Sequence, residues 1–239
     1  MAMLEVEGLS KHFGGLLANN DISFALEEGR ILGVIGPNGA GKSTLFDLIT
    51  GYQLADEGEV RFDGKRLRGL RPDQINRLGI GRTFQKLKPF TDMTVEENVM
   101  VGAMRHSPRP AAARRLALEI LEFVDLLAMR KHHAQALSTG QRKRLELARA
   151  MATRPRLLLM DEVTGGVDQR TLPGLIALVE RLKSEGMTLV IIEHNMQVLM
   201  SLADDILALH LGRKIAQGAP QAIQGNQQVI ESYLGGAYA

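Results

Sequence analysis

The chain has 239 residues, 45% of them hydrophobic and 23% charged, which is typical of one large globular domain or two small ones. Its formal net charge of +2 is too small to indicate nucleic-acid binding, and the absence of cysteine excludes disulfides, thiolate metal sites and a cysteine nucleophile. The longest apolar run, residues 187–192, is much shorter than the ~20 residues of a transmembrane helix, and the first residues lack a secretory-signal pattern. A membrane role would therefore require partner subunits.

Alternating apolar residues predict two half-buried strands at the start of the chain. Leu4 and Val6 share one face of the first strand, and Ile22 and Phe24 share one face of the second. Residues 59–67 contain an Asp-Gly pair between two extended pieces, a pattern typical of a β-hairpin. We therefore expect paired, extended segments in this part of the chain.

Three other segments are apolar throughout instead of alternating: residues 31–36, 157–161 and 188–194. Such runs are typical of strands that are buried on both faces of a parallel sheet. Residues 204–221, near the end of the chain, have the pattern strand, turn, strand. The sequence therefore predicts a largely parallel sheet with helices packed on it.

Helical patterns fill the middle of the chain, between residues 94 and 151. Apolar residues at helical spacing predict a helix over residues 112–129, and a further helix over residues 171–186 that stops at Gly186. The layout is an α/β core with a helical insertion in its middle.

A phosphate-binding loop is predicted between the first buried strand and the helix that follows it. The sequence GPNGAGKST has the G-x-x-x-x-G-K-S spacing in a strand–loop–helix context. Its glycines allow successive N–H groups to form an anion nest, and the helix adds its positive N-terminal end. Lys42 supplies a charge for the β- and γ-phosphates, and Ser43 supplies a hydroxyl for Mg²⁺. The predicted nucleotide contacts in this loop are Gly36, Pro37, Asn38, Gly39, Ala40, Gly41, Lys42, Ser43 and Thr44.

Two further buried strands end in residues that suit phosphoryl chemistry. Asp161 and Glu162 follow one strand, and His194 follows the next. Because ligands bind at the carboxyl edge of open α/β sheets, Asp161 is expected to hold the Mg²⁺ hydration shell opposite Ser43. Glu162 is expected to orient and deprotonate a water molecule, and His194 to contact the γ-phosphate.

A second glycine-centred turn, LSTGQ at residues 137–141, opens another helix. Ser138 and Gln141 have the spacing of a capping box, which by itself explains a local helix start. A capped helix N-terminus with a glycine is also a good anion site. The basic residues 142–144 are either a solvated helix face or a source of positive field near phosphates.

Six motifs and residues follow one another along the chain in this order: GPNGAGKST, Gln85 within GRTFQ, LSTGQ, LLLMDE, Asp168 and His194. Together they resemble the ATPase subunit of ABC transporters over essentially the whole chain. The resemblance implies an α/β P-loop NTPase with a RecA-like core, an N-terminal antiparallel β subdomain and an inserted α-helical subdomain. It further implies one cassette over residues 1–239, in which 1–87 and 152–239 form the β subdomain and core and 88–151 form the helical subdomain.

In this family two cassettes pair head to tail, and each ATP lies between the phosphate loop of one and the signature turn of the other. Phe13 resembles the aromatic residue that stacks on adenine, the alternative being an ordinary hydrophobic residue. Gln85 resembles the residue that links the γ-phosphate and Mg²⁺ to the helical insertion. The resemblance thus implies catalytic roles for Lys42, Gln85, Glu162 and His194, and Mg²⁺ contacts from Ser43, Gln85 and Asp161. Contacts to ATP across the dimer are implied for Ser138, Thr139, Gly140, Gln141 and Asp168.

The chain departs from the usual family pattern at three positions. Thr139 stands where Gly is commoner, Val163 where Pro is usual, and Gly165 where Ala or Ser is common. Because Asp161 and Glu162 are both present, we expect ATP hydrolysis to be retained.

Several stretches most resemble the ATPase of branched-chain amino-acid importers: KHFGGLLANNDISF, GIGRTFQ with DMTVEENV, and VIESYLGGA. The resemblance implies a second ABC ATPase subunit, identical or paralogous, together with transmembrane permease subunits and indirectly a substrate-binding protein, but no nucleic acid. It implies a cytoplasmic protein on the inner face of the membrane. Met93, Val95, Val99 and Val101 either face a permease helix or simply pack.

Other members of the same superfamily remain as alternatives. Urea, amide and lipopolysaccharide transport ATPases have similar motifs. A soluble ABC ATPase of DNA repair or translation fits less well, because the interval from Gln85 to Ser138 is too short for long coiled-coil arms. A nucleotide-binding module without turnover is disfavoured by Glu162 and His194.

Overall fold

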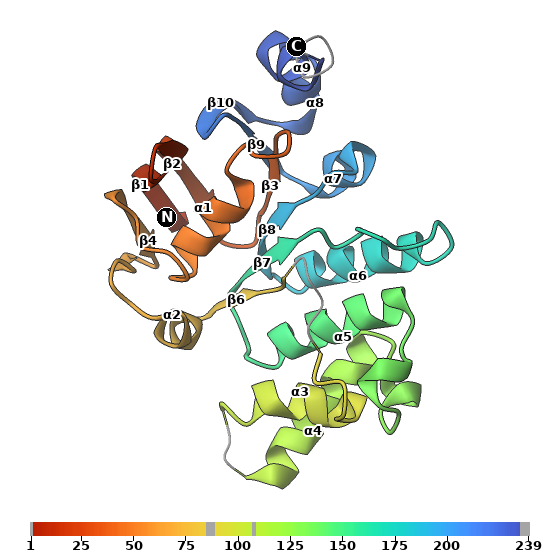
Figure 1. The fold of residues 1–239 in the computed structure, drawn as a ribbon. Coiled ribbons are helices and arrows are strands. Elements are labelled where there is room, and N and C mark those ends of the chain that lie inside the picture. The colour runs from red at the N-terminus through yellow and green to blue at the C-terminus, as the bar shows by residue number, and fades with distance from the viewer. Residues whose placement is uncertain (1, 85–88, 107–108, 235–239) are drawn as a thin grey trace.

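The computed structural model describes residues 2–84, 89–106 and 109–234, and the strands in this part of the chain form two sheets (Figure 1). The first sheet is antiparallel, in the order β2-β1-β4-β5. Its two-residue turn at Asp63 and Gly64 has positive φ at both positions, as a type I′ hairpin requires, and confirms the predicted hairpin. The strands are β1 (Ala2–Phe13), β2 (Leu16–Glu27), β4 (Glu57–Phe62) and β5 (Lys65–Arg66).

The second sheet has the order β10-β9-β3-β8-β7-β6 and is parallel except for β10. Leu158 and Met160 face one hydrophobic cluster, while Leu157 and Leu159 face another on the opposite side. The predicted strands buried on both faces are therefore confirmed. The members are β3 (Ile31–Ile35), β6 (Ile80–Arg82), β7 (Leu157–Asp161), β8 (Thr188–Ile192), β9 (Asp205–His210) and β10 (Arg213–Gly218).

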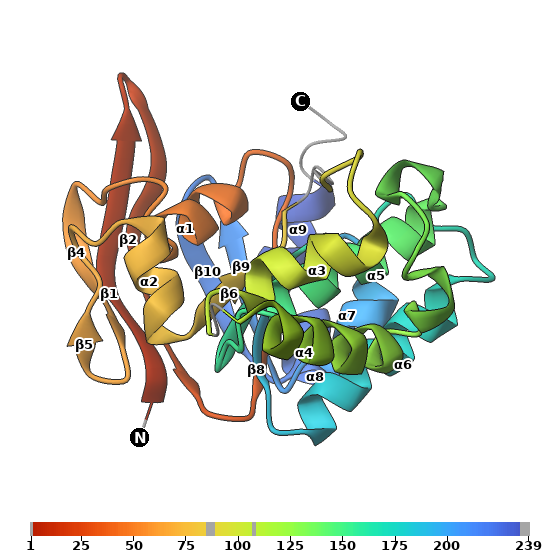
Figure 2. The same ribbon diagram turned by 90° about the horizontal axis from the view of Figure 1, so that it is seen from below.

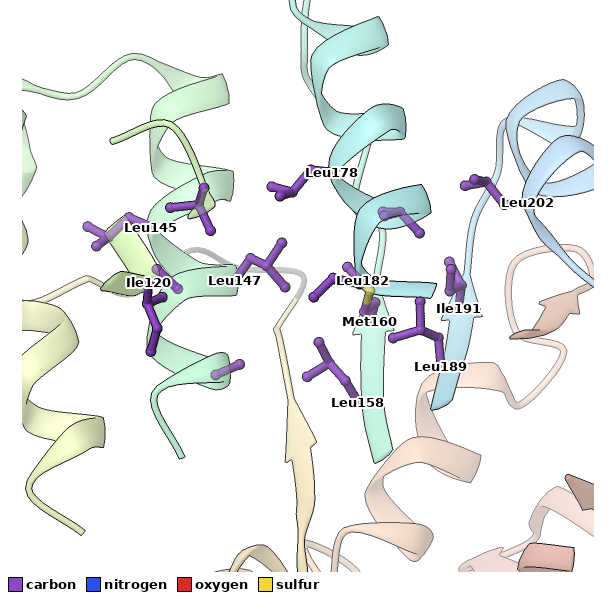
Figure 3. Packing of buried hydrophobic residues seen from close by; sticks show 14 of the residues in the cluster. Ile120, Leu145, Leu147, Leu158, Met160, Leu178, Leu182, Leu189, Ile191 and Leu202 are labelled. Carbon is purple, nitrogen blue, oxygen red and sulfur yellow. The ribbon is translucent and has the colours of Figure 1, made fainter. Parts of the chain in front are cut away.

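Helices and the antiparallel sheet cover the two faces of the parallel sheet. On one face, α6 (Leu172–Ser184) and α7 (Met196–Leu202) pack with the helical insertion, and Figure 3 shows Leu182 beside Met160 and Ile191. On the other face, α1 (Lys42–Ile49) packs between the two sheets, and α2 (Pro72–Leu78) precedes β6. This layered arrangement is the α/β P-loop fold with a RecA-like core that the family resemblance implies.

The helical insertion contains α3 (Val95–Ala103), α4 (Pro110–Phe123) and α5 (Thr139–Met151), with 3₁₀ turns at Leu127–Met129 and Ala134–Ala136. It lies on the side away from the antiparallel sheet (Figure 2). The helix predicted over 112–129 is too long at its C-terminal end, because Asp125 adopts a positive φ that no helix accommodates. The boundaries of the insertion at residues 88 and 151 stay a prediction.

The C-terminal helices α8 (Pro220–Gln224) and α9 (Gln227–Leu234) lie at the opposite end from α3 and α4 in Figure 1. They follow β9 and β10, which confirm the predicted strand, turn and strand. Within the described ranges, every helix is too short or too polar to cross a bilayer.

Candidate active site

The strand order brings the predicted site residues together. Strands β3, β8 and β7 are neighbours and parallel, so their carboxyl ends meet at one edge of the sheet. The phosphate loop follows β3, His194 follows β8, and Asp161 ends β7. A cavity of about 470 Å³ lies at this edge. Its lining includes Phe13, Asn38, Gly39, Ala40, Gly41, Lys42, Ser43, Thr44, Asp161, Glu162 and His194.

The phosphate loop is tightly curved and closely packed. Gly36, Gly39 and Gly41 all have positive φ, which favours glycine strongly. At two of these positions a side chain would also collide with neighbouring backbone: Gly36 faces the carbonyl of Leu209, and Gly41 faces the carbonyl of Ala18. The loop backbone is therefore fixed by its packing between β3 and α1.

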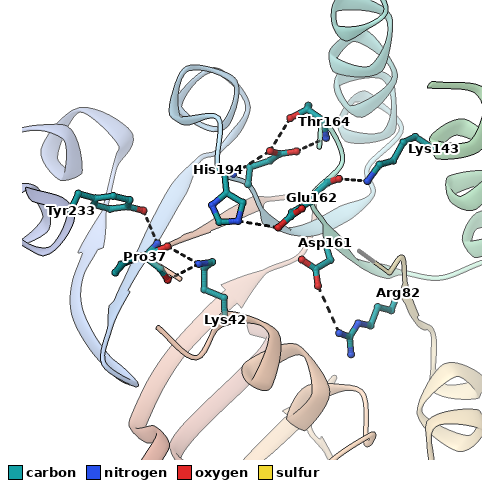
Figure 4. A network of polar contacts seen from close by, with 11 residues as sticks. Pro37, Lys42, Arg82, Lys143, Asp161, Glu162, Thr164, His194 and Tyr233 are labelled. Carbon is teal, nitrogen blue, oxygen red and sulfur yellow. Dashed lines mark hydrogen bonds and ion pairs between the residues drawn. The ribbon is translucent and has the colours of Figure 1, made fainter. Parts of the chain in front are cut away.

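Lys42 lies inside the loop with its side chain almost fully enclosed, since the residue is only 7% exposed. Its Nζ donates hydrogen bonds to the carbonyl oxygens of Gly36 at 2.6 Å and Pro37 at 3.0 Å (Figure 4). Burial lowers the pKa of Lys42, while the negative charges of Asp161 and Glu162 oppose that shift. The ammonium thus faces the two carboxylates across the cavity.

Asp161 is buried at the floor of the cavity and has a cationic neighbour that the sequence analysis missed. Arg82 Nη2 lies 3.9 Å from Asp161 Oδ2, and Arg82 Nη1 lies 2.6 Å from Asp47 Oδ1. The backbone N–H of Asp161 donates to the hydroxyl of Thr83 at 3.2 Å. Burial raises the pKa of Asp161 despite Arg82, so this carboxylate would gain from a further cation.

Glu162 and His194 form a hydrogen-bonded pair above Asp161. His194 Nε2 lies 2.9 Å from Glu162 Oε1, and both residues line the cavity. Glu162 has a φ of 52°, a left-handed conformation that is uncommon outside glycine. Two contacts hold it there: its N–H donates to Ile192 O at 2.9 Å, and Lys143 Nζ donates to its carbonyl oxygen at 2.5 Å.

Glu193 holds the segment that follows Glu162 through hydrogen bonds. This segment contains Val163 and Gly165, two of the positions that depart from the pattern described above. The Glu193 carboxylate is buried and accepts hydrogen bonds from Thr164 N at 2.6 Å and Thr164 Oγ1 at 2.9 Å. A methyl group at Gly165 would come to 3.1 Å from Glu162 Oε2. The small residue at 165 therefore leaves room for the Glu162 carboxylate.

The signature turn, residues 137–141, does not line the cavity of its own chain. Ser138 Oγ accepts from Gln141 N at 3.3 Å and Gln141 Oε1 accepts from Ser138 N at 3.0 Å, so the predicted capping box is confirmed. Thr139 is exposed beside it, and Asp168 accepts hydrogen bonds from Thr171. The cavity lining contains neither Asp168 nor any of residues 138–141.

The basic residues 142–144 are not a solvated helix face, which corrects one of the two alternatives. Lys143 is buried against Glu162, and Arg144 Nη1 donates to Val124 O at 2.9 Å and to Asp125 Oδ2 at 2.7 Å. Gln85, which the motif pattern assigns to catalysis and Mg²⁺, lies outside the described residues. Leu16, Leu17, Ala18 and Leu211 also line the cavity, although no motif assigned them to nucleotide binding.

Two protein-family models match the chain. Residues 19–165 match the model for "ABC transporter", and residues 213–239 match the model for "Branched-chain amino acid ATP-binding cassette transporter". The two matches cover different parts of the chain, the first including the phosphate loop and Asp161 with Glu162, and the second the C-terminal end.

Curated relatives match along nearly the whole length. The high-affinity branched-chain amino acid transport ATP-binding protein BraF of Pseudomonas aeruginosa is 40% identical, with 98% of each chain covered. The corresponding protein LivG of Salmonella typhimurium is 37% identical, again over 98% of each. A probable LivG of Archaeoglobus fulgidus is 38% identical over 98% of this chain and 96% of its own.

Solved structures agree with these relatives. An ATP-binding cassette of an ABC transporter in its ADP conformation superposes with a TM-score of 0.89 at 33% identity, covering 98% of this chain and 99% of its own. A dimeric bacterial ABC transporter cassette superposes with a TM-score of 0.83 at 27% identity, covering 91% and 99%. The chain belongs to the ABC transporter family and is one of its ATP-hydrolysing cassettes.

Proposed function

We propose that the chain powers an importer for branched-chain or other hydrophobic amino acids, acting through partner permease subunits. The observation that carries the choice of substrate class is the match of residues 213–239 to the branched-chain model. That segment lies outside the general transporter match over residues 19–165, so it distinguishes the type of importer. The named relatives point to the same class.

In the proposed reaction, the phosphate loop binds the triphosphate of ATP. Its N–H groups and the positive end of α1 suit anionic oxygens, and Lys42 adds a positive charge inside the loop. Phe13, which is 44% exposed at the rim of the cavity, presents its ring to adenine. These contacts position the γ-phosphorus below Glu162 and His194.

The donors at the cavity floor fit Mg²⁺. This ion binds through one or two protein oxygens and keeps phosphate oxygens and water as its other ligands. Ser43 and Asp161 line the same cavity and supply oxygen atoms, whereas the described residues hold no cluster of three or more metal-ligating side chains that would make a separate cage. We assign Ser43, Asp161 and, beyond the described residues, Gln85 as the Mg²⁺ contacts. Bound there, Mg²⁺ would neutralise charge on the phosphate oxygens.

Glu162 is the proposed general base. Its carboxylate takes a proton from a water molecule, whose oxygen forms the new bond to the γ-phosphorus while the bond from phosphorus to the ADP oxygen breaks. His194 holds Oε1 of Glu162 through Nε2 and contacts the γ-phosphate from the same side. The left-handed backbone at Glu162 aims the carboxylate into the cavity.

A second cassette, identical or paralogous, is proposed to complete each site. The α5 N-terminus carries Ser138, Thr139 and Gly140, and its positive end suits phosphate oxygens. Since the turn lies outside the cavity of its own chain, we assign it to ATP bound by the partner, with Asp168 and Gln141 at the same interface. Relatives of known structure that form dimers support this pairing.

The proposed permease contact is a second cavity, of about 230 Å³, between the core and α3. Val95 and Val99 are fully buried, so they pack in the core and do not face a permease. The exposed apolar side chains at this cavity are Phe84, Phe90 and Val101. A permease helix seated here would place the cassette on the cytoplasmic face of the membrane as a peripheral subunit.

Transport reconstitution tests the proposal. The tagged chain is isolated from membranes with its bound subunits, which are reconstituted into proteoliposomes with their substrate-binding protein, and uptake of labelled leucine and labelled urea is measured with ATP. We expect leucine uptake that requires ATP and that Glu162→Gln abolishes. ATP-dependent urea uptake without leucine uptake would reject the substrate class, and recovery without any membrane protein would reject the importer.

A further inference from the structure

The C-terminal helix α9 contacts the phosphate loop directly. Gly36, the residue at which β3 becomes the loop, donates its backbone N–H to the hydroxyl of Tyr233 at 2.7 Å (Figure 4). The residues are 197 positions apart in the chain. The ladder between β3 and β9 ends at the pair of Ile35 and Ala208, so this amide lies just beyond the sheet.

Gly36 links this contact to the charge that binds phosphate. Its N–H is held by Tyr233, while its carbonyl oxygen accepts from Lys42 Nζ at 2.6 Å. The backbone at Gly36 has a φ of 150° and lies against the carbonyl of Leu209, with no room for a side chain. A rotation of the Gly36 backbone would therefore move the acceptor on which the Lys42 ammonium rests.

Tyr233 is partly exposed, and its hydroxyl is engaged by the Gly36 N–H. The residue is 43% exposed, yet burial raises the pKa of its hydroxyl, although the hydrogen bond from the Gly36 N–H opposes that shift. Helix α9 also borders an apolar groove of about 660 Å³, which is lined on the α7 side by Met196 and Met200 and on the α9 side by Val229, Ile230 and Tyr233. The groove leaves α9 incompletely packed against α7, so its hydrogen bond to the loop matters for its position.

We propose that Tyr233 is a positioning residue for the phosphate loop, through which helix α9 sets the affinity of the cassette for ATP. By reciprocity, a partner that displaces α9 weakens nucleotide binding, and bound nucleotide holds α9 in place. The inference rests on the proposed role of the loop and Lys42 in holding the triphosphate.

Calorimetric titration with ATP and Mg²⁺ tests the inference, using Tyr233→Phe, Tyr52→Phe and Lys42→Ala in the full chain. Tyr233→Phe removes one hydroxyl and retains the ring, and we expect a Kd raised roughly 3- to 10-fold, as for the loss of one neutral hydrogen bond. The melting temperature should stay close to that of the parent. Tyr52→Phe is the matched control, because Tyr52 is similarly exposed and lies against Phe84, outside the loop, so its Kd should not change.

Hydrogen exchange of the Gly36 amide gives a second readout without nucleotide. We expect faster exchange in Tyr233→Phe and an unchanged rate in Tyr52→Phe. An unchanged Kd in Tyr233→Phe overturns the inference. If the melting temperature also falls while the Kd stays unchanged, Tyr233 has a structural role only. If Lys42→Ala also retains the parental Kd, the loop assignment itself fails, and the two failures are thereby distinguished.

Discussion

Glu162 combines an uncommon backbone conformation with a cavity-facing carboxylate. The cost of its positive φ, of order 1–3 kcal/mol for such residues, is offset by contacts from Ile192, Lys143 and His194. Strained residues that several neighbours hold in place are typical of active sites. At the residue scale, the proposed mechanism therefore depends on the orientation of this one side chain.

Replacing Glu162 by Gln should separate binding from hydrolysis. The amide keeps the shape of the side chain but cannot accept a proton, so we expect ATP affinity near that of the parent and turnover at least ~100-fold lower. Steady-state phosphate release with the assembled complex measures turnover, and Glu185→Gln, an exposed carboxylate at the end of α6, is the control. Undiminished turnover would remove Glu162 from the reaction.

Glu146 predicts a pH dependence of stability. Burial raises its pKa to about 7, although the N–H of Phe84 and the charges of Lys143 and Arg149 oppose the shift. The folded chain then binds more protons than the unfolded chain between pH ~4.5 and ~7, so the free energy of unfolding falls as pH rises through that window. Glu146→Gln should lack this pH-dependent component. The difference in the free energy of unfolding between variant and parent should therefore shift in favour of the variant by about 3 kcal/mol from pH 5 to pH 8.

Urea unfolding of parent and Glu146→Gln at several pH values measures this difference directly. A difference that stays constant across the window would contradict the assignment of the titration to Glu146. Glu122→Gln, an exposed carboxylate on α4, serves as the control.

Helix α5 joins two functional parts of the cassette. Its N-terminus is the signature turn, and one turn later Lys143 reaches the carbonyl oxygen of Glu162. The signature turn is proposed to meet the partner's ATP, while Glu162 acts on ATP in its own chain. A movement of α5 as a rigid element would therefore alter the hydrolytic centre of the same chain.

Lys143→Met should test this connection. The variant retains an unbranched apolar stem and loses the donor to Glu162, so we expect turnover to fall roughly 10-fold while ATP affinity stays unchanged, as misplaced catalytic groups cost rate more than binding. Lys131→Met, at an exposed lysine of the insertion, controls for the loss of charge. A raised Kd with normal turnover would show that Lys143 acts on nucleotide binding instead.

At the scale of the whole molecule, the separation of the signature turn from the cavity is the main argument for pairing. The cavity is lined by the phosphate loop, by the carboxyl ends of β7 and β8 and by residues of β1 and β2, whereas the N-terminus of α5 is not part of its lining. Under the proposed pairing, one chain would hold two halves of different sites.

Thr139→Glu should act only in the assembled complex. Thr139 is exposed, and a carboxylate there would repel the partner's triphosphate without disturbing the capping pair of Ser138 and Gln141. We expect unchanged ATP affinity in the isolated chain and at least ~10-fold lower turnover in the complex, with Gln135→Glu as the nearby control. Equal turnover in parent and variant complexes would argue against shared sites.

The order and period of residues in the sequence determined the main elements and most of the cavity. GPNGAGKST predicted the loop because its spacing is chemically demanding, and apolar runs ending in Asp161 and His194 predicted strand ends that the parallel sheet brings to one edge. Local chemistry also sufficed for the α5 cap and the β4–β5 turn.

Only the tertiary structure decided which residues support that site. Arg82, Lys143, Glu193 and Tyr233 reach it from β6, α5, the end of β8 and α9. They lie within stretches that the motif analysis named, but no local pattern predicts which atoms they contact. Their roles depend on long-range packing, which sets the distances and burial of charges that are remote in sequence. The same packing buried Val95 and Val99, because helical spacing alone cannot tell a face that meets the core from one that meets a partner.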